Sequence, residues 1–545
     1  MSRPREAAAI AIIGGALAIL MTWPLASGLG RLGRTGYGDG QFSIWNISWV
    51  ARTAIVDPLH VFDANIFHPH RRTLAYSEAN LGGGALAVPV YWLTRNPFAA
   101  HNAVVLFSFA SSFVCAFLLM RYLTNSAAAS APAAMLFAFC PYVFSHTAHI
   151  QLLMTGGLPL SMLMLHRAAD DPSPRRGAAL GLALAAQALS CAYYGIFAGL
   201  MVGYGALLLA TTRRLWSSRP YWTAIAVGAV TSIVCVAPFF LPYVEMQSET
   251  GFARSLADAA RWSANPQSYL ASSAHAHRWL LALIRPFERW SEVLFPGLLT
   301  TTLGIAGLIV GMRARVSRTR EIALLYGSLA ALAFWASFGP AAGLYRILYY
   351  MPLFSFLRAP SRFGLAVVLA LAVLAAIALE RVLRRLPERR RVVCSAALML
   401  AAVIDLNILP FPWERAPAFP AGYAVLAKLP RAGVAEFPFY GGRIAWPLHT
   451  QYMLFSTAHW MPLVNGYSDA VPPDWRDTAI VLDSFPSDDS FGVLARHRTR
   501  YITIHWDMFG PRADEIRRRL APFERHLKLV TSDDVMSIYE VVSFP

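Results

Sequence analysis

Charged residues are scarce in this 545-residue chain: Asp, Glu, Lys and Arg make up 14% of it, whereas 56% is hydrophobic. Soluble domains carry roughly a quarter charged residues, so this composition excludes an ordinary soluble protein and predicts an integral membrane protein. The mean hydropathy of +0.45 agrees with that prediction. At about twenty residues per membrane helix, the length leaves room for roughly ten or more spans and a modest soluble domain.

Lysine is almost absent, because Lys428 and Lys528 are the only lysines among 47 basic residues. The formal net charge is nevertheless +16. The arginines gather in short connections between apolar runs, where membrane orientation requires positive charge. The charge therefore does not indicate a nucleic-acid partner.

Cysteine is also scarce, and recognised catalytic motifs are missing. The five cysteines all fall inside apolar runs without metal-ligand spacing, so they predict neither a zinc site nor a disulfide. The signatures of serine-nucleophile enzymes, phosphate-binding loops and dinucleotide-binding folds are absent as well. Any active site must therefore be found from the placement of its side chains.

Long apolar runs are the dominant feature, and they predict about eleven transmembrane helices. The first run follows a basic flank and has no clear cleavage site, so we expect a retained anchor. The fold class predicted is an α-helical polytopic membrane protein with a small outward-facing α/β domain at its C-terminus. The expected spans are 7–27, 99–120, 127–144, 148–166, 177–192, 195–212, 220–241, 293–312, 321–338, 362–380 and 390–409.

Arginine clusters follow every second span, which places those connections and the N-terminus on the cytoplasmic side. The protein is then expected in the bacterial inner (cell) membrane, with its C-terminal domain periplasmic or extracytoplasmic. The predicted domains are a transmembrane domain, 1–409, and a soluble α/β domain, 410–545. Two long outward loops, 28–98 and 242–292, interrupt the first domain. Within the first loop, the run 81–93 is too short to span and reads as a re-entrant or interfacial piece.

The C-terminal region alternates short apolar runs with segments of helical spacing, which is typical of an α/β domain. Strands are expected at 434–439, 462–467, 500–506 and 535–542, and helices at 449–460, 472–485 and 511–523. The stretch QYMLFSTAHWMPLVNGYSD combines aromatic and polar residues in the way a sugar-binding surface does, although core packing explains the same pattern. Its candidate residues are Tyr452, His459, Trp460, Asn465, Tyr467 and Asp469.

The first outward loop carries the best candidate for catalysis. Asp39 lies between Gly38 and Gly40, which allow a tight, exposed turn before a helix. One interpretation is an N-cap, in which the carboxylate accepts a backbone N–H. The other is a general base at the membrane edge that removes a proton from a hydroxyl or amine.

Other acids and histidines follow in the same loop. The segment 57–70, DPLHVFDANIFHPH, contains ordinary metal ligands without a recognised spacing, so a structural loop with turn-capping Asp63 is the better interpretation. A divalent metal stays open. Glu78 and His68 are retained as candidates for substrate binding.

Arginines are frequent in the outward loops, against the usual bias of charge in membrane proteins. Arg358 and Arg362, in LRAPSRF before a span, are best placed to hold a lipid phosphate, because guanidinium groups bind phosphate bidentately. Ordinary contact with headgroups by long side chains is the alternative. The other outward arginines include Arg52, Arg71, Arg72, Arg254, Arg261, Arg285 and Arg289.

Three further sites lie at outward turns. Tyr194, in AYYG, is a substrate-binding candidate beside the simpler explanation of an aromatic membrane anchor. His146 is found at another such turn, together with His149, and a polar turn explains both. Glu292, in SEVLFPG, is a further acidic candidate.

Several stretches together resemble the GT-C (C-type) membrane glycosyltransferases. These are GDGQFSIWNISW, DPLHVFDANIFHPHRRTLAYSE, AQALSCAYYG, SEVLFPG, FSFLRAPSRF and YMLFSTAHWMPLVNGYS, the last of which is also similar to YfhO-like membrane proteins. The closer resemblance is to an uncharacterised bacterial subgroup that is YfhO-like or dolichyl-phosphate-mannose-dependent transferase-like. The resemblance implies a polyprenyl-phosphate-linked sugar donor, transfer on the outer face of the membrane, and an acidic base in the first outward loop, which here is Asp39.

Many members carry two adjacent acids where this chain has Gly38-Asp39-Gly40, which puts a two-carboxylate metal site in doubt. The leading hypothesis is an inverting glycosyltransferase with Asp39 as general base, and membrane lipids are further expected partners. The alternative is a non-catalytic membrane protein that binds or translocates lipid-linked sugars. Transporters place ionisable residues near the bilayer midplane, where the expected spans carry almost none.

Overall fold

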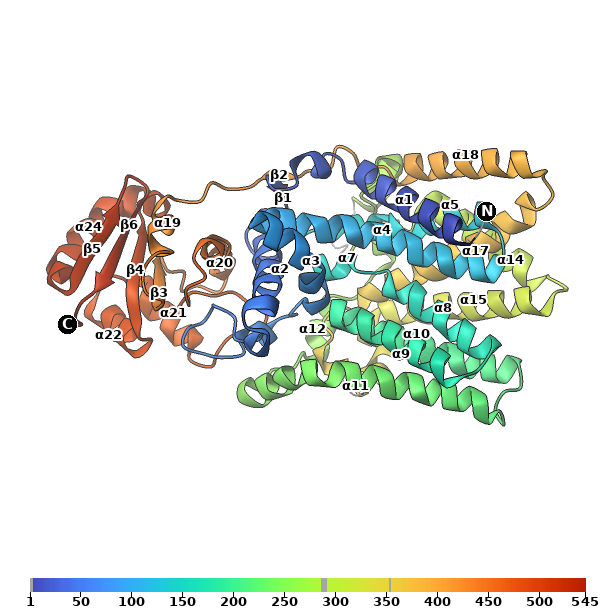
Figure 1. The fold of residues 1–545 in the computed structure, drawn as a ribbon, viewed down its shortest axis with the longest axis horizontal. Coiled ribbons are helices and arrows are strands. Elements are labelled where there is room, and N and C mark those ends of the chain that lie inside the picture. Colours follow the sequence, from blue (N-terminus) through green and yellow to red (C-terminus); the bar gives the residue numbers. More distant parts are fainter. Residues whose placement is uncertain (1–2, 286–291, 352–353) are drawn as a thin grey trace. The chain divides into compact units, whose positions relative to one another are not determined.

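The computed structural model describes residues 3–285, 292–351 and 354–545 of a largely helical chain with a four-stranded sheet and a two-stranded one (Figure 1). Arg289 lies outside these ranges, and so does Ser291, the first residue of the stretch SEVLFPG. The chain divides into two compact units. Unit 1 comprises 1–27, 104–239 and 253–412, and unit 2 comprises 28–103, 240–252 and 413–545.

Each of the eleven expected spans coincides with helical structure. Five stretches are long and apolar enough to cross a membrane: Pro97–Thr124, Ala127–Ser145, Ala192–Thr212, Arg219–Thr250 and Pro360–Leu383. The membrane character and the helical fold are therefore confirmed, and the number of eleven crossings stays a prediction. The corresponding helices are α1 (Arg3–Met21), α4 (Pro97–Thr124), α5 (Ala127–Ala138), α8 (Gly157–Asp170), α9 (Pro174–Ser190), α10 (Ala192–Thr212), α11 (Arg219–Thr250), α14 (Leu298–Met312), α15 (Ser317–Ser337), α17 (Gly364–Leu383) and α18 (Glu388–Leu406).

Unit 1 is a helical bundle whose helices approach closely at small residues. Helices α14 and α17 pack along one another, and a Cβ at Gly307 would lie 1.8 Å from the backbone oxygen of Leu374. Helices α8, α9 and α10 form a second packed group. Apolar lipid gives no hydrophobic drive for helix association, so such close backbone contact at glycine is the expected way for membrane helices to pack.

Unit 2 contains a four-stranded sheet in the order β3-β4-β6-β5. β3 (Gly433–Phe437) runs parallel to β4 (Thr499–His505), and β6 (Met536–Val541) is antiparallel to both β4 and β5 (Leu527–Ser532). Three of the four expected strands are confirmed, whereas 462–467 forms only one bridge, between Leu463 and Val434. The α-helices that accompany it in the C-terminal region are α19 (Gly422–Leu426), α20 (His449–Phe455), α21 (Trp475–Asp483), α22 (Asp488–Arg496), α23 (Trp506–Phe509) and α24 (Ala513–Leu520).

The first outward loop belongs to the same compact unit as this sheet, although the sequence placed 28–98 in the transmembrane domain. The loop contains α2 (Asp39–Val56) and α3 (Leu81–Thr94). Asn65 donates from Nδ2 to Ser456 Oγ at 3.0 Å, and the His68 N–H donates to Leu463 O at 2.7 Å. A short strand pair, β1 (Leu32–Gly33) with β2 (Glu414–Arg415), joins the same two segments.

Candidate functional site

Asp39 is the first residue of α2 and its side chain is exposed. The helix is capped by Gly38, whose φ of 84° suits glycine, and no side chain bonds at the cap. Gly38 therefore occupies the N-cap position, and Asp39 follows it as the first helical residue. A carboxylate in the first turn of a helix is stabilised as an anion by the helix dipole, which suits a residue that must be ionised before it accepts a proton.

The start of α2 is fixed by a threonine of α20. The Gly38 N–H donates to the Thr450 hydroxyl at 2.9 Å, and that hydroxyl lies 2.9 Å from Gln41 Oε1. Further along, Ile44 of α2 packs with Leu454 of α20 in a buried apolar cluster. The backbone that presents Asp39 is thus held by buried contacts within unit 2.

The loop after α2 is a structural support in its central part. Trp45 Nε1 donates to Asn65 Oδ1 at 3.0 Å, and Trp49 Nε1 donates to Val61 O at 2.8 Å. Asp63 accepts the Arg72 N–H at 2.8 Å, as expected of a turn-capping residue. The described residues contain no group of three or more His, Cys, Asp or Glu placed to hold a metal ion.

His68 lies against the first residue of β3, since a Cβ at Gly433 would come within 2.8 Å of its ring. Burial, and to a smaller extent the neighbouring charges of His497 and Arg498, lower the pKa of His68 to about 4. The ring is therefore neutral near pH 7. Glu78 uses its backbone oxygen to accept from Asn46 Nδ2 at 3.1 Å, and it is partly buried.

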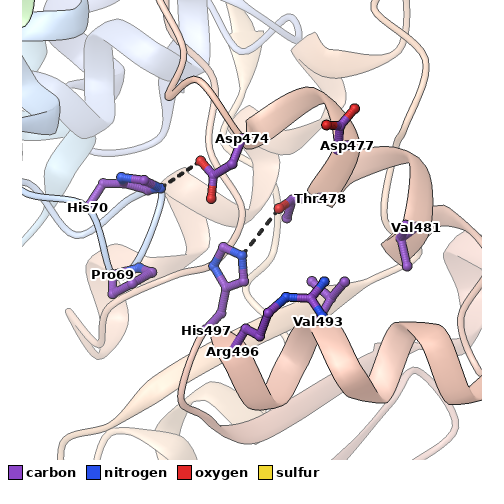
Figure 2. Close-up of a pocket in the computed structure, with 9 residues that line it drawn as sticks. All are labelled: Pro69, His70, Asp474, Asp477, Thr478, Val481, Val493, Arg496 and His497. Carbon is purple, nitrogen blue, oxygen red and sulfur yellow. Dashed lines mark hydrogen bonds and ion pairs between the residues drawn. The ribbon is translucent and has the colours of Figure 1, made fainter. Parts of the chain in front are cut away.

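A cavity of about 260 Å³ lies beside this loop within unit 2. His70, Asp474, Asp477, Thr478 and Arg496 contribute polar groups to its wall, as Figure 2 shows. His70 Nε2 lies 2.9 Å from Asp474 Oδ1, which ties the loop to the start of α21. Carboxylates that accept and a guanidinium that donates suit a ligand rich in hydroxyl groups.

In unit 1, three arginines gather around one tyrosine. The guanidinium carbon of Arg362 lies 4.3 Å from the ring centre of Tyr193, and the Ala359 N–H donates to the Tyr193 hydroxyl. The charges of Arg254 and Arg358 also act on Tyr193. We call these four residues the Tyr193 cluster. All three arginines are partly exposed, so a ligand can reach them.

Aromatic residues contact two further arginines of this cluster, Arg358 through its guanidinium group and Arg254 through its backbone. Arg358 Cζ stands 5.0 Å from the ring centre of Trp262, and the Tyr349 hydroxyl donates to Arg254 O at 2.7 Å. The Nε of Arg362 is buried and has no hydrogen-bond partner. Because a buried donor without a partner costs roughly 1–3 kcal/mol, this arrangement favours an anion that would accept from it.

Tyr194 does not line an open site. Its side chain is completely buried in α10, and its hydroxyl donates to Tyr142 Oη at 3.2 Å. The membrane-anchor interpretation therefore fails along with the sugar-site one, because both require an exposed ring.

Glu292 pairs with His146, whose Nε2 lies 3.5 Å from its carboxylate, and both side chains are about nine-tenths buried. Burial raises the pKa of Glu292, but hydrogen bonding to His146 and the charges of His146 and Arg362 outweigh burial and lower it overall. Glu292 is thus an ionised acid within reach of the positive field of Arg362. Glu292 lies close enough to Arg362, a member of the Tyr193 cluster, for their charges to attract one another.

The proposed sugar-binding surface of the C-terminal domain is mostly core. Tyr452 and Asn465 are fully buried, and Trp460 is 6% exposed. Asn465 accepts the Glu436 N–H at 2.8 Å and donates to Glu436 O at 2.9 Å, which fixes the chain beside β3. The alternative explanation, core packing, is correct for these three residues.

The sequence pointed to Arg358 and Arg362 but did not connect them with Tyr193, Trp262 or Arg254. Arg254 was visible only as one of many outward arginines. The ring partners of a guanidinium come from helices far apart in the chain, and no local spacing reveals them. The sequence showed the arginines next to an apolar span and, separately, the Tyr193-Tyr194 pair at another outward turn.

The fold is shared with membrane glycosyltransferases of known structure. All of this chain aligns with 42% of the mycobacterial arabinofuranosyltransferase AftD, at 15% identity and a TM-score of 0.60. In a second match, 96% of this chain aligns with 73% of the Archaeoglobus fulgidus oligosaccharyltransferase in its apo form, at 12% identity and a TM-score of 0.51. ArnT from Cupriavidus metallidurans bound to undecaprenyl phosphate aligns over 97% of both chains, at 14% identity and a TM-score of 0.50.

No protein-family model matches the chain, and neither does any curated protein sequence. At these identities the structural matches show a shared fold alone. The predicted resemblance to the GT-C superfamily agrees with that fold, and the YfhO-like subgroup stays a prediction.

Proposed function

We propose that this protein is a membrane glycosyltransferase that moves a sugar from a polyprenyl-phosphate-linked donor to an acceptor on the outer face of the membrane. The observation that carries the proposal is the Tyr193 cluster, in which a buried Arg362 Nε lacks a partner at the start of an apolar helix. A phosphate joined to a hydrocarbon chain matches both parts of that environment. Structural neighbours include a transferase bound to undecaprenyl phosphate, which supports the same class of donor.

The reaction assigns separate tasks to named groups. Asp39 removes a proton from the acceptor hydroxyl, and the acceptor oxygen attacks the anomeric carbon of the sugar. The bond from that carbon to the phosphate oxygen breaks, and the polyprenyl phosphate leaves with the electron pair. Arg358 and Arg362, together with Arg254, stabilise the negative charge of the leaving group. Attack opposite the leaving group inverts the anomeric configuration.

The rival function, binding or translocation of lipid-linked sugars, requires ionisable groups near the bilayer midplane. In the five apolar stretches described above, the acidic and basic residues lie toward the ends, as Arg121, Arg219, Glu245, Arg362 and Glu380 do. This distribution favours chemistry at the membrane surface. His68 and Glu78 keep their proposed substrate-binding roles only as second-rank candidates, because both are used by the folded loop.

The test uses membranes that contain full-length protein, incubated with synthetic polyprenyl-phosphate monosaccharides. We expect Asp39→Asn to reduce release of polyprenyl phosphate by about 100-fold or more, the usual size of a lost general base. Asp57→Asn, which changes an exposed acid of the same loop, should leave the rate within about two-fold. Full activity of Asp39→Asn at normal expression would refute the assignment of the base.

A further inference from the structure

A second arginine group lies in unit 2, around Trp460. The guanidinium carbon of Arg52 lies 5.5 Å from the ring centre of Trp460, and Arg431 Nη1 donates to Trp460 O at 2.6 Å. Arg95 stacks on Trp92, with its guanidinium carbon 3.7 Å from the ring centre. We call Arg52, Arg95 and Arg431 the Trp460 arginines.

These rings are themselves held in place. Trp460 Nε1 donates to Tyr91 Oη at 3.2 Å, and Trp92 Nε1 donates to Ala51 O at 3.1 Å. Helix α3 is pressed onto α2 at this point, because a Cβ at Gly84 would lie 2.2 Å from Val50 Cγ1. The arginines therefore sit on a rigid aromatic platform made by α2, α3 and the segment after α20.

The positive charge of this group has no carboxylate paired with it among the described residues. Burial lowers the pKa of Arg52, and the charge of Arg95 lowers it further. Burial likewise lowers the pKa of Arg431, with the charge of Arg52 adding to the effect. Like charges held near one another without an acid favour the binding of an anion.

Exposed aliphatic residues lie close in sequence to two of these arginines, Arg52 and Arg95. Arg52, Ile55 and Val56 follow the i, i+3, i+4 spacing that places residues on one side of a helix, and Ile55 and Val56 are more than half exposed. Leu93, next to Trp92, is 85% exposed. Helix α3 is apolar but only 14 residues long, too short to cross a bilayer. Exposed aliphatics beside tryptophan and arginine are typical of a surface that lies in the membrane interface.

We propose that the Trp460 arginines bind the phosphate of an anionic membrane lipid, while Ile55, Val56 and Leu93 contact its glycerol and acyl region. A free phosphate would use the charge alone and would leave the aliphatic surface exposed to water. A lipid headgroup matches both the charge and the apolar rim. This site is separate from the Tyr193 cluster and does not depend on which reaction the protein performs.

The experiment measures lipid retention by native mass spectrometry of the full-length protein in detergent. Phosphatidylglycerol and phosphatidylcholine are titrated against wild type, Arg95→Gln and the matched control Arg518→Gln. Arg518 is an exposed arginine of α24, so Arg518→Gln removes the same charge from another part of unit 2. Arg95 is chosen because it is exposed, so its replacement leaves the buried contacts of Trp460 intact.

Each arginine near a membrane surface contributes about 1 kcal/mol of attraction to anionic lipid, which corresponds to roughly a five-fold change in affinity. We expect wild type and Arg518→Gln to prefer phosphatidylglycerol, and Arg95→Gln to bind it roughly five-fold more weakly. The variant Arg52→Gln/Arg95→Gln should lose most of the preference. Equal retention of both lipids by wild type would overturn the proposal. So would equal loss in Arg95→Gln and Arg518→Gln, or displacement of the lipid by an equal concentration of inorganic phosphate.

Discussion

Replacing Arg362 by glutamine tests the donor site most directly, because this residue contributes a buried Nε without a partner and a stacked guanidinium. Glutamine removes the charge and the planar fork while keeping a polar side chain. A hydrogen bond that involves a charged group contributes roughly 1.5–3 kcal/mol, so the loss of one phosphate contact should weaken donor binding by about 10- to 150-fold. Arg362→Lys keeps the charge but loses the stacking of the guanidinium on Tyr193, so its affinity for the donor should lie between those of wild type and Arg362→Gln.

Stability gives the second readout for the same variants. In the structure Arg362 Nε makes no hydrogen bond, so glutamine loses the contact with the Tyr193 ring, about 0.5–2 kcal/mol, together with the attraction between Arg362 and Glu292. Donor saturation and thermal unfolding in detergent are measured together, with Arg346→Gln as control. Arg346 is an exposed arginine of the same unit, in α16 (Leu344–Tyr349). Unchanged donor affinity in a folded Arg362→Gln protein would refute the phosphate-binding role.

Two further predictions concern unit 1. The pKa of Glu292 is lowered from 4.5 in the folded protein, so its stabilising contribution is present above about pH 4.5 and is lost as the pH falls through the lower folded value. Thermal melts should therefore show that stability falls more steeply with decreasing pH in wild type than in Glu292→Gln. Parallel curves of melting temperature against pH would contradict this. Gly307→Ala places a Cβ 1.8 Å from Leu374 O and should destabilise the protein by about 1–3 kcal/mol. The control Gly199→Ala has no atom within 4 Å of its new Cβ and should leave stability unchanged. Equal melting temperatures of the two variants would show that α14 and α17 do not pack so closely.

Helices of the membrane region could be predicted because hydrophobicity accumulates over about twenty residues and survives errors at single positions. The predicted ends of the helices were less accurate. Helix α14 begins at Leu298, whereas 293 was expected, and α11 continues to Thr250, beyond the expected 241. Helix ends depend on polar partners that composition does not reveal. β5 was missed for a related reason: its residues are partly exposed, so they carry no strong alternation.

The inclusion of the first outward loop in the same compact unit as the C-terminal sheet could not be predicted, because it depends on contacts between residues nearly four hundred positions apart. Asn65 donates both to Ser456 Oγ and to Met461 O at 3.0 Å, and neither partner can be inferred from the local sequence. A hydropathy pattern identifies the loop only as a segment between two spans. The same limit applies to the arginine groups, whose ring partners Tyr193 and Trp460 come from distant elements.

The C-terminal domain is therefore more than an addition to the membrane helices. The helix that presents Asp39 is held at its first turn by Thr450 and along its side by Leu454, both from α20. A base must be positioned within a few tenths of an ångström to be effective, and rigid secondary structure achieves this better than a free loop. If Asp39 is the base, the sheet domain positions it through α20, and changes in that domain should affect catalysis without touching the substrate.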